Sequence, residues 1–573
     1  MSNILETLDA GLTGLFGQWN GYSTGLVTVL VVVLGYQILR AADPDVHPIL
    51  LARQSTPSAV RKEGESAVYR SPLAPHGMPL NSGLNVKPAG ASKWARGHDG
   101  DLRDIWRKVV QGGNAGAKGK LLTVHGSQNV QEHNLDDVTR QINLIGQHIT
   151  EQGGIRVAIY LPNSMELLAA LFACAFSENL TAVLIPFDVP EERLVSMLRR
   201  AAVDTVITAT GEFPLDAVVK AYPGLRQLIW VVDRGSAHMD WNEVPEGIGG
   251  SVSVATWQDI VRDAAADAGR ELPAAPAADS EATSAVGDVV TFWQSGKPND
   301  QQQEMVRFTQ ANLIAGVAGQ LAAIPTKARL TNADLFLPAS ALTGAHALVL
   351  TLAALYSNAS VALNSAAGAR AIDLTVATQG IAPTVVVADS AALLQTRARA
   401  MAKLPSPLGT LAHALSRRTL VNEGIMAGAN NALSAFASAA RPVLGNAPGA
   451  LRLVYTTDRA GSQQTPGLSP AALTDLRVLT GARVVYALAA AKVAGAVAQT
   501  AVYDYRAEVG DEKGHFGAPT SSVEVVLKDS GSYKTTDDQA AGEIYVKGPC
   551  VSGGEAGLGV MGVIRDDHTL ALA

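Results

Sequence analysis

The stretch RVAIYLPNSMELLAALFACAFSENLTAVLIPFD, residues 156–188, decides the fold of this chain. It opens with a short apolar run that ends at a proline, continues through a segment of helix length, and closes with a second apolar run. A buried strand, a helix and another buried strand in this order predict parallel pairing through a right-handed crossover. The stretch therefore indicates an α/β fold.

The alternation of apolar runs and helical spacing continues on both sides of this stretch. Helical spacing before it covers 101–111 and 134–152, and a second alternating block begins at 288. Strand-like runs near the end, at 522–528 and 542–548, have no helices between them. This pattern predicts an α/β protein of stacked, doubly wound subdomains with a smaller β unit.

Composition excludes several classes of protein. The chain has 573 residues, of which 47% are hydrophobic and 17% charged, so it is not a disordered chain. Its net charge of -7 offers no basic field for nucleic acid, and no nucleic-acid partner is expected. The two cysteines, Cys174 and Cys550, exclude a disulfide framework, and no Cys/His cluster has the spacing of a metal site.

Residues 21–39 form an apolar segment without a charged side chain. A helix of about 20 apolar residues spans a bilayer, so we predict a retained transmembrane helix after a short tail, residues 1–20. A buried core helix or a cleaved signal peptide are the alternatives, although the tail lacks the basic residues of a signal peptide. Arginines follow the segment, so the positive-inside rule predicts a single-pass protein with its C-terminal bulk in the cytosol. The membrane is then that of the endoplasmic reticulum, the outer mitochondrial membrane or the peroxisomal membrane.

The rest of the chain divides by composition. Residues 40–100 are rich in Pro, Gly and Ser and indicate an irregular tether, and residues 101–573 form the main domain. Within it, 263–287 is a predicted surface loop and 392–445 a helical insertion. The insertion is either solvated or lies on a membrane surface.

Several segments resemble, in the same order, the adenylate-forming (AMP-binding) superfamily of acyl-CoA synthetases, luciferases and peptide-synthetase adenylation domains. The stretch 156–188 is similar to the family's "VAIxLPNSxE" block. Five further segments carry the resemblance: FTQANLIAGVAGQ (308–320), LTGAHALVLTLAALYSNASVAL (342–363), LRLVYTTDRAG (451–461), ARVVYALAAAKVAGAVAQT (482–500), and HFGAPTSSVEVVLKD with GEIYVKGPCVSGG (515–554). The helical insertion and the predicted anchor favour the long-chain fatty acyl branch.

The resemblance implies a cleft for an acyl group and a nucleotide, and a two-step reaction. ATP and a carboxylate give an acyl-adenylate, and the thiol of CoA then displaces AMP. Such chemistry needs a phosphate loop, Mg²⁺, a ribose anchor and a lysine on a C-terminal lid. If the chain is an active ligase, we expect it to use ATP or AMP, Mg²⁺ and CoA. If it is inactive, we expect no cofactor.

The phosphate loop of the family is altered here. Ser295, Gly296 and Lys297 survive as nucleotide-site remnants, but the hydroxyl-rich turn and the second glycine are missing. Asp300 adds negative charge where the triphosphate would lie. The stretch is either a remnant turn or a functional phosphate loop, and we favour the remnant.

Other requirements of the reaction also fail in the sequence. The "GYGxTE" motif reads Tyr486 to Ala490, so Tyr486 could still stack on a base, whereas Ala489 and Ala490 offer no oxygen to a metal. Thr456–Arg459 replace the adenine contact, and Val560 stands where the ribose-binding aspartate belongs. The expected lid, with its lysine, does not follow Val560; a truncated gene is the alternative explanation.

These losses predict no catalytic residue and no metal site. His346 is either a core histidine or part of the acyl cleft. We expect a membrane-anchored, catalytically inactive relative of the long-chain acyl-CoA synthetases with a lipid-related binding or scaffolding role. Its expected partners are the membrane, through residues 21–39, an acyl chain or acyl-CoA, and a protein. The alternatives are a divergent long-chain fatty acid–CoA ligase with relocated groups, and an interaction protein that uses the fold only as a surface.

Overall fold

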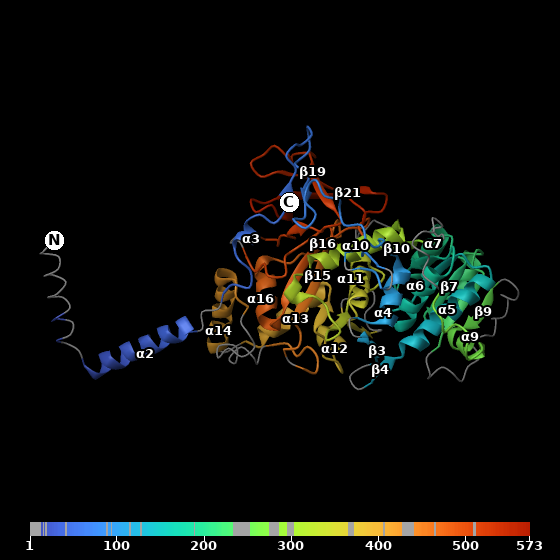
Figure 1. Cartoon of the computed structure of the whole chain (residues 1–573), viewed down its shortest axis with the longest axis horizontal. Coiled ribbons are helices and arrows are strands. Elements are labelled where there is room, and N and C mark those ends of the chain that lie inside the picture. Colours follow the sequence, from blue (N-terminus) through green and yellow to red (C-terminus); the bar gives the residue numbers. More distant parts are fainter. Residues whose placement is uncertain are drawn as a thin grey trace. The chain divides into compact units, whose positions relative to one another are not determined.

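The computed structural model describes most of the chain from residue 13 to residue 573 (Figure 1). The description omits residues 15–16, 18–19, 40–42, 88–89, 93, 114–115, 126–128, 188, 233–251, 274–285, 295–302, 365–371, 405–406, 427–440, 448, 463–465 and 508–511. The chain divides into two compact units, Met1–Asp45 and Val46–Ala573.

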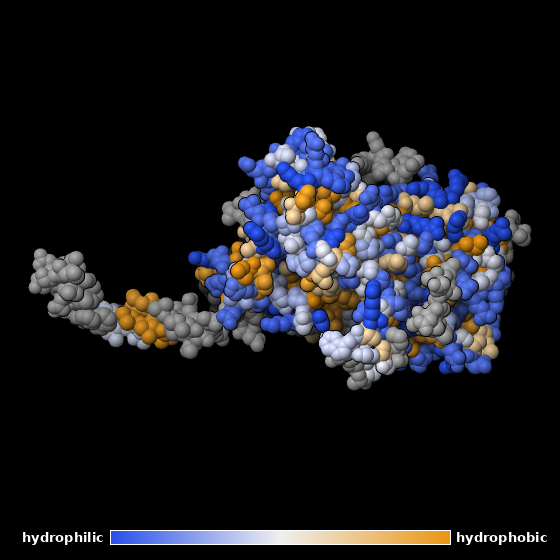
Figure 2. Space-filling model, turned by 45° about the horizontal axis from the view of Figure 1, so that its top comes forward, coloured by the Kyte–Doolittle hydropathy of each residue, from blue (hydrophilic) through white to orange (hydrophobic). Residues whose placement is uncertain are grey.

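The first unit contains the helix α2 (Gly21–Leu39), as the apolar segment predicts. Asn20 caps it, because its side-chain oxygen accepts from the backbone N–H groups of Tyr22 and Ser23 at 3.0 Å. Apolar side chains between Leu26 and Val32 are exposed (Figure 2). Among the residues that the structure describes, no helix combines the length and apolar character that a membrane span requires.

A seven-stranded sheet forms one layer of the second unit, with strand order β11-β10-β6-β5-β7-β8-β9. All neighbours pair in parallel except β10 and β11. The strands are β5 (Arg156–Tyr160), β6 (Thr181–Leu184), β7 (Thr205–Ala209), β8 (Gln227–Val231), β9 (Ser253–Thr256), β10 (Val289–Trp293) and β11 (Glu304–Phe308), and the helices α5 (Leu135–Glu151), α6 (Met165–Phe176), α7 (Glu191–Arg200), α8 (Leu215–Ala221) and α9 (Trp257–Asp263). The parallel crossover expected for 156–188 is confirmed.

A nine-stranded sheet forms a second layer, in the order β18-β17-β16-β15-β14-β12-β13-β3-β4, parallel from β16 to β3. Its strands are β3 (Leu121–Val124), β4 (Val130–His133), β12 (Leu335–Pro338), β13 (Ser360–Asn364), β14 (Val385–Val387), β15 (Leu453–Arg459), β16 (Arg483–Ala489), β17 (Ala498–Gln499) and β18 (Ala518–Pro519). Its helices are α4 (Leu102–Gln111), α10 (Gln310–Ala323), α11 (Ala345–Tyr356), α12 (Leu374–Ala377), α13 (Ser390–Ala402), α14 (Pro407–Arg418) and α16 (Pro470–Thr480).

Helix α6 explains why the deciding stretch is apolar throughout. It contacts β5 and β6 of one sheet and β3 of the other, and its residues from Leu167 to Ala175 are all buried. A helix buried on all sides carries apolar residues all round rather than on one stripe. One apolar core therefore runs through both parallel sheets.

The third layer is a six-stranded antiparallel sheet, in the order β1-β2-β19-β20-β21-β22. It consists of β1 (Thr56–Pro57), β2 (Tyr69–Arg70), β19 (Glu524–Lys528), β20 (Ala541–Lys547), β21 (Glu555–Ile564) and β22 (Leu570–Leu572). The predicted tether, 40–100, thus contributes two short strands, and Arg70 forms an ion pair with Glu524 at 2.6 Å.

Two predicted surface segments lie partly outside the described residues. For the loop 263–287 these are 274–285, and for the insertion 392–445 they include 427–440. The described part of the insertion is helical, through α13, α14 and a π-helical turn at Thr419–Glu423.

Candidate functional site

The carboxyl ends of strands from both parallel sheets converge on one cavity of about 130 Å³. In α/β proteins this edge of a sheet is where ligands bind. The lining residues come from the ends of β10, β14, β15 and β16, from the loop after β12, and from the first turn of α11: Phe292, Trp293, Gln294, Ser340, Ala341, Thr343, Gly344, Ala345, His346, Ala347, Val387, Ala388, Asp389, Thr456, Thr457, Arg459, Ala489 and Ala490, with Pro186, Val493 and Gly495. The family resemblance predicts a cleft between the subdomains, and this cavity lies where two of their sheets meet.

Arg459, the last residue of β15, carries the positive charge of this cavity. Its guanidinium carbon lies 4.2 Å from the centre of the Trp293 ring, at the end of β10 in the other sheet. Such stacking holds a guanidinium in one plane and is favourable by roughly 1–2 kcal/mol where the cation is desolvated. The contact bridges the two sheets across the cleft.

Asp389, just after β14, carries the only carboxyl group among the residues that line the cavity. Burial raises its pKa, and the hydrogen bond from Ser340 and the charge of Arg459 offset this effect only in part. The Oγ of Ser340 donates to Oδ1 of Asp389 at 2.9 Å. The carboxyl group is thus engaged by a hydroxyl, and its pKa lies above its ordinary value.

His346 lies in the first turn of α11 and lines the cavity. Burial lowers its pKa to about 4, so the imidazole is neutral at physiological pH. Its Nε2 is buried and has no hydrogen-bond partner among the described residues. His346 is therefore buried, as a core histidine would be, and it also lines this cavity.

Tyr486 does not offer a face for base stacking in this arrangement. Its side chain is fully buried in β16, and its ring packs against Phe516 with the centroids 4.9 Å apart. Its hydroxyl donates to Oδ2 of Asp458 at 3.1 Å and accepts from the backbone N–H of Leu468 at 3.0 Å. Because these neighbours surround the ring, Tyr486 contributes to the core behind the cavity and not to its wall.

The other predicted site residues are only partly placed. Ser295, Gly296 and Lys297 lie outside the described residues, which stop at Gln294 and resume at Gln303. Ala489 and Ala490 do line the cavity. Val560, in β21, does not line the cavity. It lies beside Gly461, where an added β-carbon would stand 3.8 Å from Cγ1 of Val560.

The described walls of the cavity do not fit a magnesium ion. Magnesium requires several oxygen ligands, and carboxylates supply them in most protein sites. The methyl groups of Ala489 and Ala490 supply none, and the Asp389 carboxyl is bonded to Ser340. Across the described part of the chain, no group of three or more His, Cys, Asp or Glu side chains could hold a metal.

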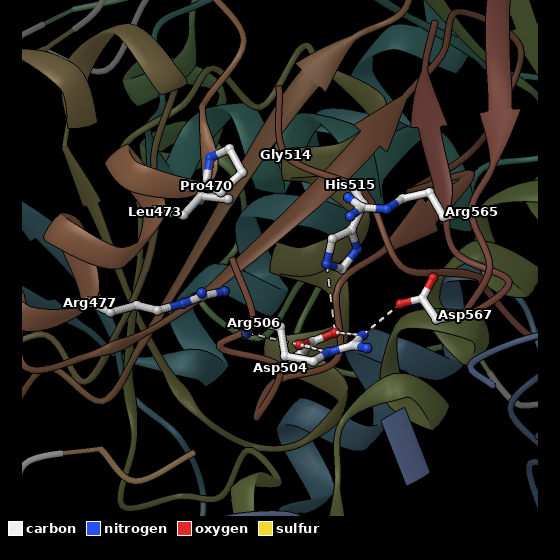
Figure 3. Close-up of a pocket in the computed structure, with 9 residues that line it drawn as sticks. All are labelled: Pro470, Leu473, Arg477, Asp504, Arg506, Gly514, His515, Arg565 and Asp567. Carbon is white, nitrogen blue, oxygen red and sulfur yellow. Dashed lines mark hydrogen bonds and ion pairs between the residues drawn. The ribbon is translucent and has the colours of Figure 1, made fainter. Parts of the chain in front are cut away.

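A second, much smaller cavity lies beside α16 and is lined mainly by charged groups (Figure 3). Arg506 donates to Asp504 and to Asp567, and His515 lies 3.7 Å from Asp504. Arg477 and Arg565 complete the wall. Arg506 already pairs with both carboxylates, so the charged groups of this wall bind one another. This ion-pair network links the loop around Asp504 to Asp567 near the C-terminus.

Comparison with known proteins agrees with the architecture. Residues 121–280 match the family model described as AMP-binding enzyme. The chain contains an AMP-binding domain. The matched residues begin with β3 and continue through the parallel strands β5 to β9. This match confirms the resemblance to the AMP-binding superfamily that the sequence motifs indicated.

Several solved structures with a similar fold are CoA ligases. The anthranilate CoA ligase AuaEII superposes with a TM-score of 0.57 at 14% identity, over 82% of this chain and 77% of that one. The long-chain-fatty-acid-CoA ligase FadD1 of Archaeoglobus fulgidus gives 0.57 at 12% identity, over 86% of each chain. The N-terminal domain of FACL13 from Mycobacterium tuberculosis gives 0.55 at 13% identity, over 82% of this chain and 99% of that one. At these identities the likeness shows the fold of the AMP-binding domain alone.

A curated relative matches a short part of the chain. Over 99 residues the chain is 33% identical to the uncharacterized protein YHR045W of Saccharomyces cerevisiae. This match covers 16% of the chain and 17% of that protein's length.

Sequence reasoning did not single out Trp293 or Asp389. Asp389 directly follows the strand-like run PTVVVAD, and the carboxyl end of a parallel strand is the position at which a polar residue commonly faces a ligand. That signal could have found Asp389. Trp293 stacks on Arg459, which belongs to the other sheet. The residues next to Trp293 in sequence do not indicate how the two sheets pack, so they could not predict this contact.

Proposed function

We propose that this protein is a membrane-anchored relative of the acyl-CoA ligases that binds an acyl ligand in the cavity without activating it. The observation that carries the proposal is the chemistry of the wall at the end of β16. Ala489 and Ala490 face the cavity with methyl groups, where activation of a carboxylate by Mg²⁺–ATP needs an oxygen ligand. A lipid-related binding or scaffolding role, with a protein partner, is compatible with such a cavity.

The apolar part of the wall supports binding of an acyl group. The cavity is lined by Ala341, Ala345, Ala347, Ala388 and Val493, beside a comparable share of polar and charged side chains. Apolar surface together with fixed polar groups that orient a ligand is typical of small-molecule sites. The solved neighbours with similar folds include an anthranilate CoA ligase and a long-chain-fatty-acid-CoA ligase.

The test measures binding and catalysis in the same preparation. The purified full chain is titrated with carboxylic acids by calorimetry and is assayed for thioester formation with ATP, Mg²⁺, CoA and the same acids. We expect saturable binding of an acid and no thioester above the rate of a no-enzyme control. ATP-dependent thioester formation would establish instead the second candidate, a divergent fatty acid–CoA ligase, which the fold of the solved neighbours favours.

Membrane anchoring through residues 21–39 is tested separately. We expect the full chain, expressed in a eukaryotic cell, to stay in the membrane pellet after alkaline carbonate extraction, with its C-terminal bulk open to protease from the cytosolic side. A matched chain lacking residues 1–40 should be released. Release of the full chain would overturn the anchor, and protection of the bulk would overturn its cytosolic orientation.

A further inference from the structure

Helix α14 presents two leucines to the surface and directs charged side chains inward. Nε2 of His413 lies 3.0 Å from Oδ1 of the buried Asp475 in α16, and Nε of Arg417 lies 3.3 Å from the same oxygen. On the opposite face of α14, Leu411 is 57% exposed and Leu415 is 39% exposed. A helix on the surface of a globular protein normally has the reverse arrangement, with its apolar stripe on the core. The outward leucines therefore indicate an apolar partner outside the second unit.

The short helix α3 (Ile49–Ala52) presents two more apolar side chains. Ile49 is 71% exposed and Leu50 is 65% exposed, whereas Leu51 is buried. Figure 1 shows α3 and α14 at the same end of the second unit, and Figure 2 shows apolar residues at that end with hydrophilic residues around them. Exposed apolar surface with a polar rim is typical of a site that meets a partner.

Both segments are basic, although the chain as a whole is acidic. The net charge of the chain is -7, yet residues 46–62 and 390–418 contain no Asp or Glu. Among their basic side chains, Arg53, Lys403 and Arg418 are exposed. Apolar and basic side chains together fit the surface of a bilayer with anionic lipids, because the apolar groups enter the acyl boundary and the basic groups meet the headgroups.

The chain itself would bring this end of the second unit to a membrane. Only residues 40–48 separate the proposed anchor, residues 21–39, from Ile49. A segment of that length reaches at most roughly 35 Å when it is fully extended. Such a short tether keeps the surface at a high effective concentration beside the bilayer. This connection favours the membrane over an acidic protein as the partner.

We propose that the face formed by α3 and the outer side of α14 lies on the surface of the membrane that holds residues 21–39. The exposed isoleucine and leucines of the two helices enter the lipid boundary, and the basic side chains meet anionic headgroups. This inference rests on the proposed function, because the anchor supplies the membrane. It adds a second point of contact with the bilayer, and hence a fixed orientation, which an anchor alone does not provide.

The experiment measures how close α14 lies to lipid in the full chain. The chain is reconstituted in vesicles of phosphatidylcholine, with or without phosphatidylserine, that contain nitroxide-labelled lipids. Both native cysteines are buried, so a thiol-reactive fluorophore labels a cysteine introduced as Leu415→Cys selectively. The matched control is Ile155→Cys, which is also exposed and precedes β5. With phosphatidylserine present, we expect the lipids to quench the label at Leu415→Cys at least threefold more than the label at Ile155→Cys.

Charge reversal tests the basic side chains. Arg418→Glu combined with Lys403→Glu, in the chain labelled at Leu415→Cys, should lower the quenching to the level found without phosphatidylserine. Arg262→Glu, at an exposed position on α9, is the control and should leave the quenching unchanged. Equal thermal midpoints exclude misfolding of the variants.

The other outcomes separate this inference from the anchor. Equal quenching at Leu415→Cys and Ile155→Cys, in a chain that floats with the vesicles, would overturn the inference and leave the anchor standing. Equal quenching with both lipid compositions would overturn the role of anionic lipid. A label at Leu415→Cys that is shielded from iodide before lipid is added would show that protein covers the leucines. A full chain that does not float with the vesicles would overturn the anchor and the inference together.

Discussion

Arg506 and Asp504 form a two-point ion pair, with Nε of Arg506 2.9 Å from Oδ1 and Nη2 2.8 Å from Oδ2 of the carboxylate (Figure 3). The same Nη2 donates to Asp567 near the C-terminus at 2.8 Å, and Gln54 donates to Asp504 at 2.6 Å. Three segments that are remote in sequence therefore meet around this ion pair.

Asp504→Asn should destabilise the fold. The side chain of Asp504 is completely buried, and without its charge the partly exposed Arg506 keeps only Asp567 as an ionised partner. We expect the free energy of unfolding to fall by about 2 kcal/mol, the loss of hydrogen bonds to a charged group. Urea denaturation followed by circular dichroism measures this, with the exposed Asp538→Asn as the control. A loss no larger than that of the control would mean that the pair contributes nothing to stability.

The same carboxylate predicts how stability depends on pH. Burial by itself would raise the pKa of Asp504, but the hydrogen bond and charge of Arg506 bring it down to about 2. Because this folded-state pKa is depressed below the unfolded value of about 3.9, the stabilisation is complete above pH 4 and is lost as pH falls towards 2.

Urea denaturation at pH 5 and at pH 3 measures the effect. Wild type should lose more stability between the two values than Asp504→Asn, which has no carboxylate to protonate there. Equal losses in the two proteins would assign the acid sensitivity to other groups.

Much of the fold follows from sequence for a local reason. The run RVAIY, residues 156–160, is apolar because β5 is buried in a parallel sheet, and α6 is apolar all round because it lies between two sheets. Likewise, the position of Ala489 and Ala490 in the cavity wall could be predicted, because they end a strand whose neighbours end at the same edge.

The parts that sequence did not predict depend on long-range contacts. Gln54 and Asp504 are 450 positions apart, and no local pattern marks them as partners. Trp293 and Arg459 come from different sheets, so their contact depends on how the sheets meet. Tyr486 was expected at the ligand because of its motif, but Phe516 and Asp458 enclose it.

Gly316→Ala should displace the backbone segment 493–495, which forms part of the cavity wall. A β-carbon at Gly316, in α10, would stand 2.3 Å from the backbone oxygen of Ala494, which lies between the cavity residues Val493 and Gly495. Backbone cannot yield to such a clash without moving, and overpacking of this kind costs about 1–3 kcal/mol. We expect that loss of stability and a weaker affinity for the carboxylic acid that binds wild type, measured by urea denaturation and calorimetry.

The matched control is Gly25→Ala in α2, where a β-carbon meets nothing within 4 Å. It should leave the main unfolding transition and the affinity unchanged. An unaltered affinity in Gly316→Ala would show that the segment 493–495 moves without consequence for the cavity.

Asp389→Asn should strengthen the binding of an anion. The substitution removes the only negative charge that lines the cavity, while its side-chain oxygen can still accept from Ser340. In wild type, burial raises the pKa of Asp389, so the carboxyl group loses its proton as pH rises and then repels a bound carboxylate. The other titratable residues of the wall do not change charge above pH 5, since the pKa of His346 is about 4 and Arg459 stays protonated.

A carboxylic acid ligand itself stays ionised above about pH 5, so its own titration does not enter. Calorimetry over a rising series of pH values should show an affinity that falls in wild type as Asp389 loses its proton, and a constant, higher affinity in Asp389→Asn. Ser340→Ala is the informative companion, because it removes the hydroxyl that stabilises the ionised form and should raise the affinity at high pH. A wild-type affinity that is constant over this range, together with no gain in Asp389→Asn, would place the bound anion away from Asp389 and therefore away from Arg459.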